Sequence, residues 1–146
     1  MIEKLKLSIR KASKTDLKEV SEIFYKESSK KPYSQEWTEE TALDKIKELF
    51  KNGDIYVTVQ DNLLGFVSCR KTHQGKNVFI DELWVKSGHQ RKGVGRALVS
   101  FIENEYRKRG VSTITLISDK KSGAFAFYKT LDYKESKQYA LMKKRL

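Results

Sequence analysis

Residues 78–110, VFIDELWVKSGHQRKGVGRALVSFIENEYRKRG, form the stretch of sequence that decides the fold. Its first part predicts a strand that carries Asp81 and Glu82. A short basic loop follows, from Gln90 to Gly95, and apolar residues at helical spacing then predict an amphipathic helix that ends at Gly110. The loop N–H groups, together with the unpaired N–H groups and the positive dipole end of the helix, make a cradle suited to phosphate.

The two acids of this strand lie beside the predicted phosphate cradle. Asp81 and Glu82 are adjacent, so in a regular strand their side chains point to opposite faces and only one faces an acceptor. A phosphate cradle next to a carboxylate indicates transfer of a chemical group from a phosphate-bearing carrier.

Length and composition bound the class of protein. The 146 residues, 38% of them hydrophobic, suffice for a real core, and we expect a single domain over residues 1–146. No apolar run approaches the roughly 18 residues of a membrane span. The Lys-rich first residues lack the apolar region of a signal peptide, so we expect a cytoplasmic location and no membrane. Cys69 is the single cysteine, which excludes an internal disulfide.

The formal net charge of +11 has two interpretations. It is compatible with a nucleic-acid partner. However, the lysines are spread over every segment, and no zinc, helix-turn-helix or RNA-binding motif accompanies them. We therefore expect a solvated basic surface, used locally at the phosphates of a cofactor, and we consider a nucleic-acid partner unlikely.

The remaining pattern predicts alternating groups of strands and helices. We expect strands over residues 5–10, 55–59, 63–70, 78–85 and 111–117, and one or two closing strands after residue 133. We expect helices after an N-cap pair Ser13 and Asp16, from Thr38 to a stop at Asn52-Gly53, after the glycine loop, and over residues 122–131. This order predicts an α/β fold with a mixed, mostly antiparallel sheet and about four helices.

The glycine loop fits neither of two well-known nucleotide motifs. A dinucleotide-binding loop would need a third glycine and a later acid, and a P-loop would need Gly-Lys-Ser/Thr where this chain has Gly95-Arg96-Ala97. What remains is Q-x-x-G-x-G, formed by Gln90, Gly93 and Gly95, at a strand-to-helix junction.

On these residues the chain resembles the GNAT family of N-acetyltransferases. Their acetyl-CoA loop is R/Q-x-x-G-x-G/A, and Glu82 to Val85 (ELWV) looks like the acidic end of the preceding strand. Residues 124–133, AFAFYKTLDY, are similar to the family helix A-x-x-x-Y-x-x-L-G-F, and Ile9, Arg10 and Asp16 match a common start. The resemblance covers nearly the whole chain and implies the GNAT-like acyl-CoA N-acyltransferase fold, with acetyl-CoA as co-substrate.

The resemblance also implies roles for individual residues. Glu82 is the favoured general base, Asp81 is the alternative, and Tyr128 matches the general acid that protonates the leaving thiolate. The residues expected to bind the cofactor are Leu83, Trp84, Val85, Gln90, Arg91, Lys92, Gly93, Val94, Gly95, Arg96, Lys121 and Tyr128. No metal is expected, because two histidines and one cysteine make no metal constellation.

The chain departs from the family at three positions. Ser87 stands where proline is common, and Lys121 stands where many relatives carry a cofactor-binding asparagine. Asp132 replaces a glycine, which Asp tolerates because it adopts the left-handed conformation more readily than most residues.

The acceptor and the class of function keep alternatives open. A small amine, a polyamine and a protein amine all remain, although acids at Glu36, Glu39, Glu40 and Asp44 near the expected acceptor loop favour a cation or serve a helix dipole. A non-catalytic CoA-sensing or nucleic-acid-binding module on the same fold is the alternative function. Both a monomer and a homodimer are compatible with the sequence.

Overall fold

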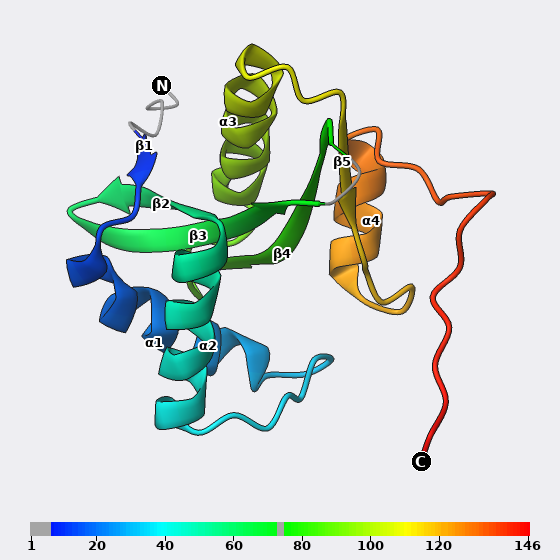
Figure 1. Cartoon of the computed structure of the whole chain (residues 1–146). Helices are drawn as coiled ribbons and strands as arrows, with labels where there is room; N and C mark the ends of the chain where they lie inside the picture. Colours follow the sequence, from blue (N-terminus) through cyan, green and yellow to red (C-terminus); the bar gives the residue numbers. More distant parts are fainter. Residues whose placement is uncertain (1–6, 73–74) are drawn as a thin grey trace.

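The computed structural model describes residues 7–72 and 75–146, and in this part of the chain five strands form one sheet (Figure 1). The strands follow the order β1-β2-β3-β4-β5; the first four pair antiparallel, and β5 pairs parallel to β4. Their bounds are β1 Ser8–Lys11, β2 Asp54–Gln60, β3 Asn62–Lys71, β4 Asn77–Val85 and β5 Thr113–Leu116. The prediction of a mixed, mostly antiparallel sheet is confirmed.

Four α-helices and one short 3-10 helix in the described residues cover the sheet. They are η1 Lys14–Asp16, α1 Leu17–Ser28, α2 Glu39–Asn52, α3 Val94–Lys108 and α4 Gly123–Thr130. Figure 1 shows α1 and α2 on one side of the sheet and α3 on the other. One apolar cluster joins α1 and α2 to the sheet around Phe24, Ile46 and Phe66, and a second joins α3 and α4 to it around Leu98, Ile102 and Tyr128.

Local sequence signals place the starts of the first two long helices. The Asp16 carboxylate accepts the backbone N–H of Ser13 at 2.8 Å, and it also binds the Arg10 guanidinium at 2.7 Å. Thr38 caps α2 by accepting the Thr41 N–H at 3.0 Å. The predicted N-cap pair Ser13 and Asp16 is present at η1, which leads directly into α1. Thr38, predicted as the first residue of the second helix, is its N-cap, and both caps are local features of the sequence.

Gly53 ends α2 for a different reason from the predicted cap. Its φ of −163° is extended, not left-handed. A Cβ at this position would lie 2.1 Å from the Cys69 carbonyl oxygen of β3. Glycine is needed here because two backbones approach closely, so tertiary packing and not helix capping decides this residue.

Two predicted segments fall partly outside the described residues. Leu5 and Lys6 of the first predicted strand lie there, as does His73 of the turn before β4. The described part of the first strand begins at Ser8.

Helix α4 ends in a Schellman motif. The N–H of Tyr133 donates to the Tyr128 carbonyl at 3.1 Å, and the N–H of Asp132 donates to the Lys129 carbonyl at 3.1 Å. Asp132 adopts a φ of +66°, as predicted for the position where relatives carry glycine. The rings of Tyr128 and Tyr133 pack edge to face with centroids 5.4 Å apart, so this helix end also fixes Tyr128.

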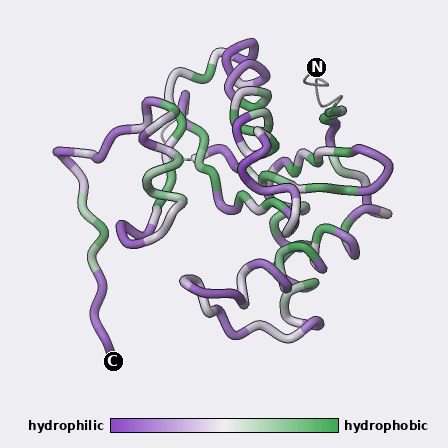
Figure 2. The backbone as a smooth tube through the Cα atoms, turned by 180° about the vertical axis from the view of Figure 1, so that it is seen from behind, coloured by the Kyte–Doolittle hydropathy of each residue, from purple (hydrophilic) through white to green (hydrophobic). Residues whose placement is uncertain are grey.

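The prediction of one or two closing strands is wrong. Residues 133–146 contain no strand, and in both views the tail extends away from the rest of the molecule (Figures 1 and 2). Tyr139, Leu141 and Met142 are all largely exposed. The β-forming composition of this segment does not produce a strand, because a strand needs a partner edge and the tail lies against none.

Substitution of Asp132 tests the strain at the end of α4. We expect Asp132→Ala to lower the free energy of unfolding by about 1 kcal/mol, because the left-handed conformation brings the alanine Cβ too close to the backbone, and alanine has no polar side chain to offset this. Asp132→Gly should be close to neutral, since glycine adopts this conformation freely. Chemical denaturation of both variants measures the difference, and equal stability of the two would contradict the Schellman assignment.

Candidate active site

The site forms where β4 and β5 stop pairing. Their parallel register runs from Asn77 opposite Thr113 to Ile80 opposite Leu116 and ends there. Residues 81–85 of β4 continue along β3 without a partner on the β5 side. The β5-side edge of residues 81–85 is therefore unpaired, and we call the place where the two strands separate the opening.

A β-bulge at this point sets the direction of the two acids. The register between β3 and β4 passes from Ser68 opposite Glu82 to Cys69 opposite Ile80, which leaves Asp81 as the extra residue. Glu82 pairs with Lys45 of α2, and Asp81 lines a pocket that α2 also lines. The expectation of opposite faces does not hold, because the bulge breaks the alternation of a regular strand.

Glu82 is held by two donors and surrounded by aromatic rings. Its carboxylate accepts the Trp84 indole N–H at 2.6 Å and binds the Lys45 ammonium at 2.8 Å. The Trp84 ring packs against Phe24 and against Tyr33, with centroids 6.1 Å and 4.8 Å away. The carboxylate is therefore held in one position, next to aromatic side chains on the face of the sheet that α1 and α2 cover.

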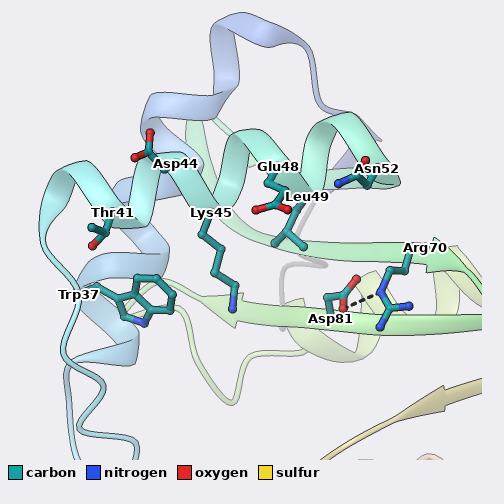
Figure 3. Close-up of a pocket in the computed structure, with 9 residues that line it drawn as sticks. All are labelled: Trp37, Thr41, Asp44, Lys45, Glu48, Leu49, Asn52, Arg70 and Asp81. Atoms are coloured by element: carbon teal, nitrogen blue, oxygen red, sulfur yellow. Dashed lines mark hydrogen bonds and ion pairs between the residues drawn. The ribbon is translucent and has the colours of Figure 1, made fainter.

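Asp81 lies in a pocket of about 470 Å³ between α2 and the sheet (Figure 3). An ion pair with the Arg70 guanidinium at 3.0 Å satisfies its carboxylate. The pocket is lined by Trp37, Thr41, Asp44, Lys45, Glu48, Leu49, Asn52, Arg70 and Asp81. The acids Asp44 and Glu48 are exposed on the α2 wall.

The main chain of β4 presents polar groups to the opening. Lys86 N–H donates to the Leu64 carbonyl of β3 at 2.7 Å. Because the bonds of an antiparallel ladder alternate, the main-chain groups of Trp84 face β3, and those of Leu83 and Val85 face the opening. The side chains of Leu83 and Val85 pack on the α3 side of the sheet.

The glycine loop folds back on itself through three left-handed residues. Gly88, Arg91 and Gly93 have φ values of +88°, +60° and +88°. The first helical hydrogen bond of α3 runs from Ala97 N–H to the Gly93 carbonyl at 2.9 Å.

The loop therefore presents donors and positive charge to solvent. The N–H groups of residues 94–96, which come before the first helical hydrogen bond donated by Ala97, have no partner within the helix and point out of its N-terminus. Val94 is buried and anchors the helix, while Arg91, Lys92 and Arg96 are exposed around that end.

Gly95 lies where the loop meets α4. A Cβ there would lie 3.4 Å from the Phe127 ring of α4 and 3.8 Å from Val85 of β4. The first turn of α3 thus lies close to both β4 and α4.

Gln90 holds the loop in place from within. Its side-chain amide donates to the Val85 carbonyl at 2.9 Å and to the Glu27 carboxylate at 3.1 Å. Ser87 donates to Glu27 through its hydroxyl at 2.9 Å and its N–H at 3.3 Å. Lys30 also pairs with Glu27 at 3.1 Å.

Glu27 is the residue that sequence reasoning missed. Its side chain is only 5% exposed, although it lies on α1, far from the loop in sequence. The one available signal was a glutamate on the apolar face of a predicted helix, next to Val20, Ile23 and Phe24 at helical spacing.

Tyr128 lies on α4 and is buried in the α3-side cluster. Burial raises the pKa of its phenol well above the ordinary value, and the charges of Cys69, Glu82 and Tyr33 add to the effect. The phenol therefore keeps its proton at neutral pH. Lys121 is exposed just before the N-terminus of α4.

Other candidate chemistry finds no support in the described residues. Burial raises the pKa of the Cys69 thiol to about 12, so it packs and does not act as a thiolate. Within residues 7–72 and 75–146, no three His, Cys, Asp or Glu side chains gather as metal ligands would. None of the helices in this part of the chain has the length and apolar content that a membrane span requires.

Comparison with known proteins gives the family. Residues 17–133 match the model of the acetyltransferase (GNAT) family, so the chain belongs to this family. A search of curated protein sequences gives no significant match.

Several solved structures share the fold. A possible acetyltransferase from Clostridium difficile 630 has a TM-score of 0.80 at 19% identity, covering 96% of this chain and 97% of that one. The ribosomal-protein-S18-alanine N-acetyltransferase from Escherichia coli has a TM-score of 0.71 at 22% identity, covering 89% and 79%. AAC(6')-Iy, in complex with the bisubstrate analog CoA-S-monomethyl-acetylneamine, has a TM-score of 0.70 at 16% identity, covering 96% and 99%. At these identities the likeness establishes the fold and not the acceptor.

Substitution of Glu27 tests its role as the anchor of the loop. We expect Glu27→Ala to lower the free energy of unfolding by about 1–3 kcal/mol, because Ser87 and Gln90 lose their hydrogen bonds to a charged, buried acceptor. Glu22→Ala, at an exposed position of the same helix, is the matched control and should change stability by less than about 0.5 kcal/mol. Thermal or chemical denaturation makes the comparison, and an equal effect of the two variants would exclude the anchor.

Proposed function

We propose that the protein is an acetyl-CoA-dependent N-acetyltransferase that moves an acetyl group directly to an amine acceptor. The observation that carries the proposal is the position of Glu82, a fixed carboxylate beside the opening between β4 and β5. The same strand leads into the glycine loop and the N-terminus of α3. Family membership supports the proposal, as does the CoA-linked analog bound by AAC(6')-Iy.

The opening and the loop would hold the two parts of the cofactor. The N–H groups of residues 94–96 fit the pyrophosphate, and Arg91, Lys92 and Arg96 would supply charge. The main-chain groups of Leu83 and the N–H of Val85, which face the opening, fit the amides of the pantetheine arm; the Val85 carbonyl is taken by Gln90. Gly93 and Gly95 have no side chains that would cover the N–H groups of the loop. Gln90 would hold the loop in position through its hydrogen bonds to Val85 and Glu27. Lys121 would be available for a further phosphate contact.

Glu82 would act as the general base. The acceptor arrives as an ammonium ion and becomes a nucleophile only after it loses a proton, which a carboxylate within hydrogen-bond distance can accept. A β4 N–H facing the opening, that of Leu83 or Val85, can then stabilise the negative charge that develops on the carbonyl oxygen. Bound acetyl-CoA supplies the activated thioester.

Tyr128 would protonate the leaving thiolate. Its raised pKa keeps the proton on the phenol until it is needed, but it also makes transfer to a thiolate unfavourable on its own. The transfer becomes favourable when the phenolate regains a proton from the nitrogen that has just been acylated. Tyr128 therefore acts as a relay between the nitrogen and the sulfur.

The pocket between α2 and the sheet is the proposed entrance for the acceptor. Its wall carries the exposed carboxylates of Asp44 and Glu48 and the indole of Trp37. Carboxylates and an aromatic face attract a cation, so this entrance favours a positively charged primary amine.

Substitution of the two acids decides which one is the base. We expect Glu82→Gln to lower kcat by about 10²-fold or more, with unchanged affinity for CoA, because only proton removal is lost. Asp81→Asn should have a smaller effect, since Asp81 is already paired with Arg70. Thiol release across a panel of polyamines, amino acids and basic peptides measures kcat, and calorimetry measures CoA binding. CoA binding without turnover of any amine would favour the alternative function, a non-catalytic CoA-sensing module, over an acetyltransferase.

Removal of the Tyr128 hydroxyl tests the relay. We expect Tyr128→Phe to lower kcat by about 10²-fold while leaving stability nearly unchanged, because the ring still fills its place in the cluster. Tyr25→Phe, a half-buried tyrosine of α1 outside the proposed site, is the matched control and should keep full turnover. The role is wrong if Tyr128→Phe turns over at the wild-type rate.

A further inference from the structure

The Lys45 ammonium lies against the carboxylate of the proposed general base, Glu82. Its Nζ is 2.8 Å from the Glu82 carboxylate, and the side chain is 31% exposed. The charge lies over the Phe24 and Trp37 rings, 5.3 Å and 5.0 Å from their centroids. Figure 3 shows Lys45 reaching from α2 toward β4, beside Trp37.

This position meets one geometric requirement for an acceptor nitrogen, the distance to the base. A general base has to lie within hydrogen-bond distance of the proton that it removes, and Lys45 Nζ satisfies this for Glu82. A lysine is also a primary alkylamine on a flexible stem, so it becomes a competent nucleophile once neutral. Lys47 and Lys51 lie on the same helix but are exposed, which makes them internal references.

We propose that Lys45 is a self-acetylation site, modified by acetyl-CoA bound to the same chain. This inference rests on the proposed function, because it uses the same base and the same donor. It adds a specific acceptor atom within the protein, Nζ of Lys45.

The step balances without any further reactant. A bond forms between Lys45 Nζ and the acetyl carbonyl carbon, the carbon–sulfur bond breaks, and no atom is oxidised or reduced. Two protons leave the nitrogen. Glu82 passes one to solvent, and the other replaces the proton that Tyr128 gives to the CoA thiolate.

The modification changes the site itself. Acetyl-Lys45 carries no charge, so it loses both the ion pair with Glu82 and the cation–π contacts with Phe24 and Trp37. Glu82 is then free to bind the ammonium of an external acceptor. Unmodified Lys45 and an external amine compete for the same carboxylate.

The experiment compares two acetylating reagents on the full chain. Purified protein is incubated with acetyl-CoA and no added amine, and peptide mass spectrometry follows Lys45, Lys47 and Lys51 over time. A parallel sample receives trace acetic anhydride, which reports intrinsic reactivity without the active site. We expect anhydride to label Lys45 more slowly than the two exposed lysines, because Lys45 is paired and partly covered.

With acetyl-CoA the order should reverse. We expect Lys45 to react about 10²-fold faster than Lys47 and Lys51, and Glu82→Gln to remove this advantage. The rate should not change when the protein is diluted, since donor and acceptor belong to one chain. Lys45→Arg is the control, which keeps the charge and should show no preferred site.

The outcomes separate this inference from the proposed function. Release of CoA with external amines while Lys45 stays unmodified would overturn self-acetylation alone. Acetylation that is equal at the three lysines, or that slows on dilution, would overturn it as well. Absence of both transfer and CoA binding would overturn the proposed function and this inference together.

Discussion

The separation of β4 from β5 after Ile80 is the constraint on which the rest of the site depends. A regular parallel pair would use the main-chain groups of Leu83 and Val85 in the ladder and leave no opening. The bulge at Asp81 occurs at the same point and turns both acids toward α2. One local break in pairing therefore creates the opening and places the candidate base beside it.

The glycine loop depends on this strand and on a buried carboxylate from another part of the chain. Glu27 of α1 accepts hydrogen bonds from Ser87 and Gln90, and Gln90 in turn binds the Val85 carbonyl at the end of β4. Helix α1 and the loop that would hold phosphate are thus parts of one hydrogen-bonded unit. Serine at position 87 contributes to it through a hydroxyl that proline would lack.

Much of the fold could be predicted because its signals are local. Apolar spacing located α1 to α3, the family resemblance supported α4, and Asp132 was expected to tolerate the left-handed conformation that it adopts, with a φ of +66°. The tail shows the limit of such signals. Tyr139 to Met142 has strand-forming composition, yet it stays exposed, because strand formation depends on an available edge and not on composition alone.

The sequence by itself determined the order of elements up to α4, the Q-x-x-G-x-G loop at a strand-to-helix junction, and the helix that carries Tyr128. Each of these depends on residues within about one or two turns of one another. Only the tertiary structure decided that Asp81 and Glu82 face the same side, that Glu27 holds the loop, and that Lys45 lies against Glu82. These features depend on strand register and on contacts such as that of Glu27 with Gln90, 63 residues apart, which no local pattern encodes.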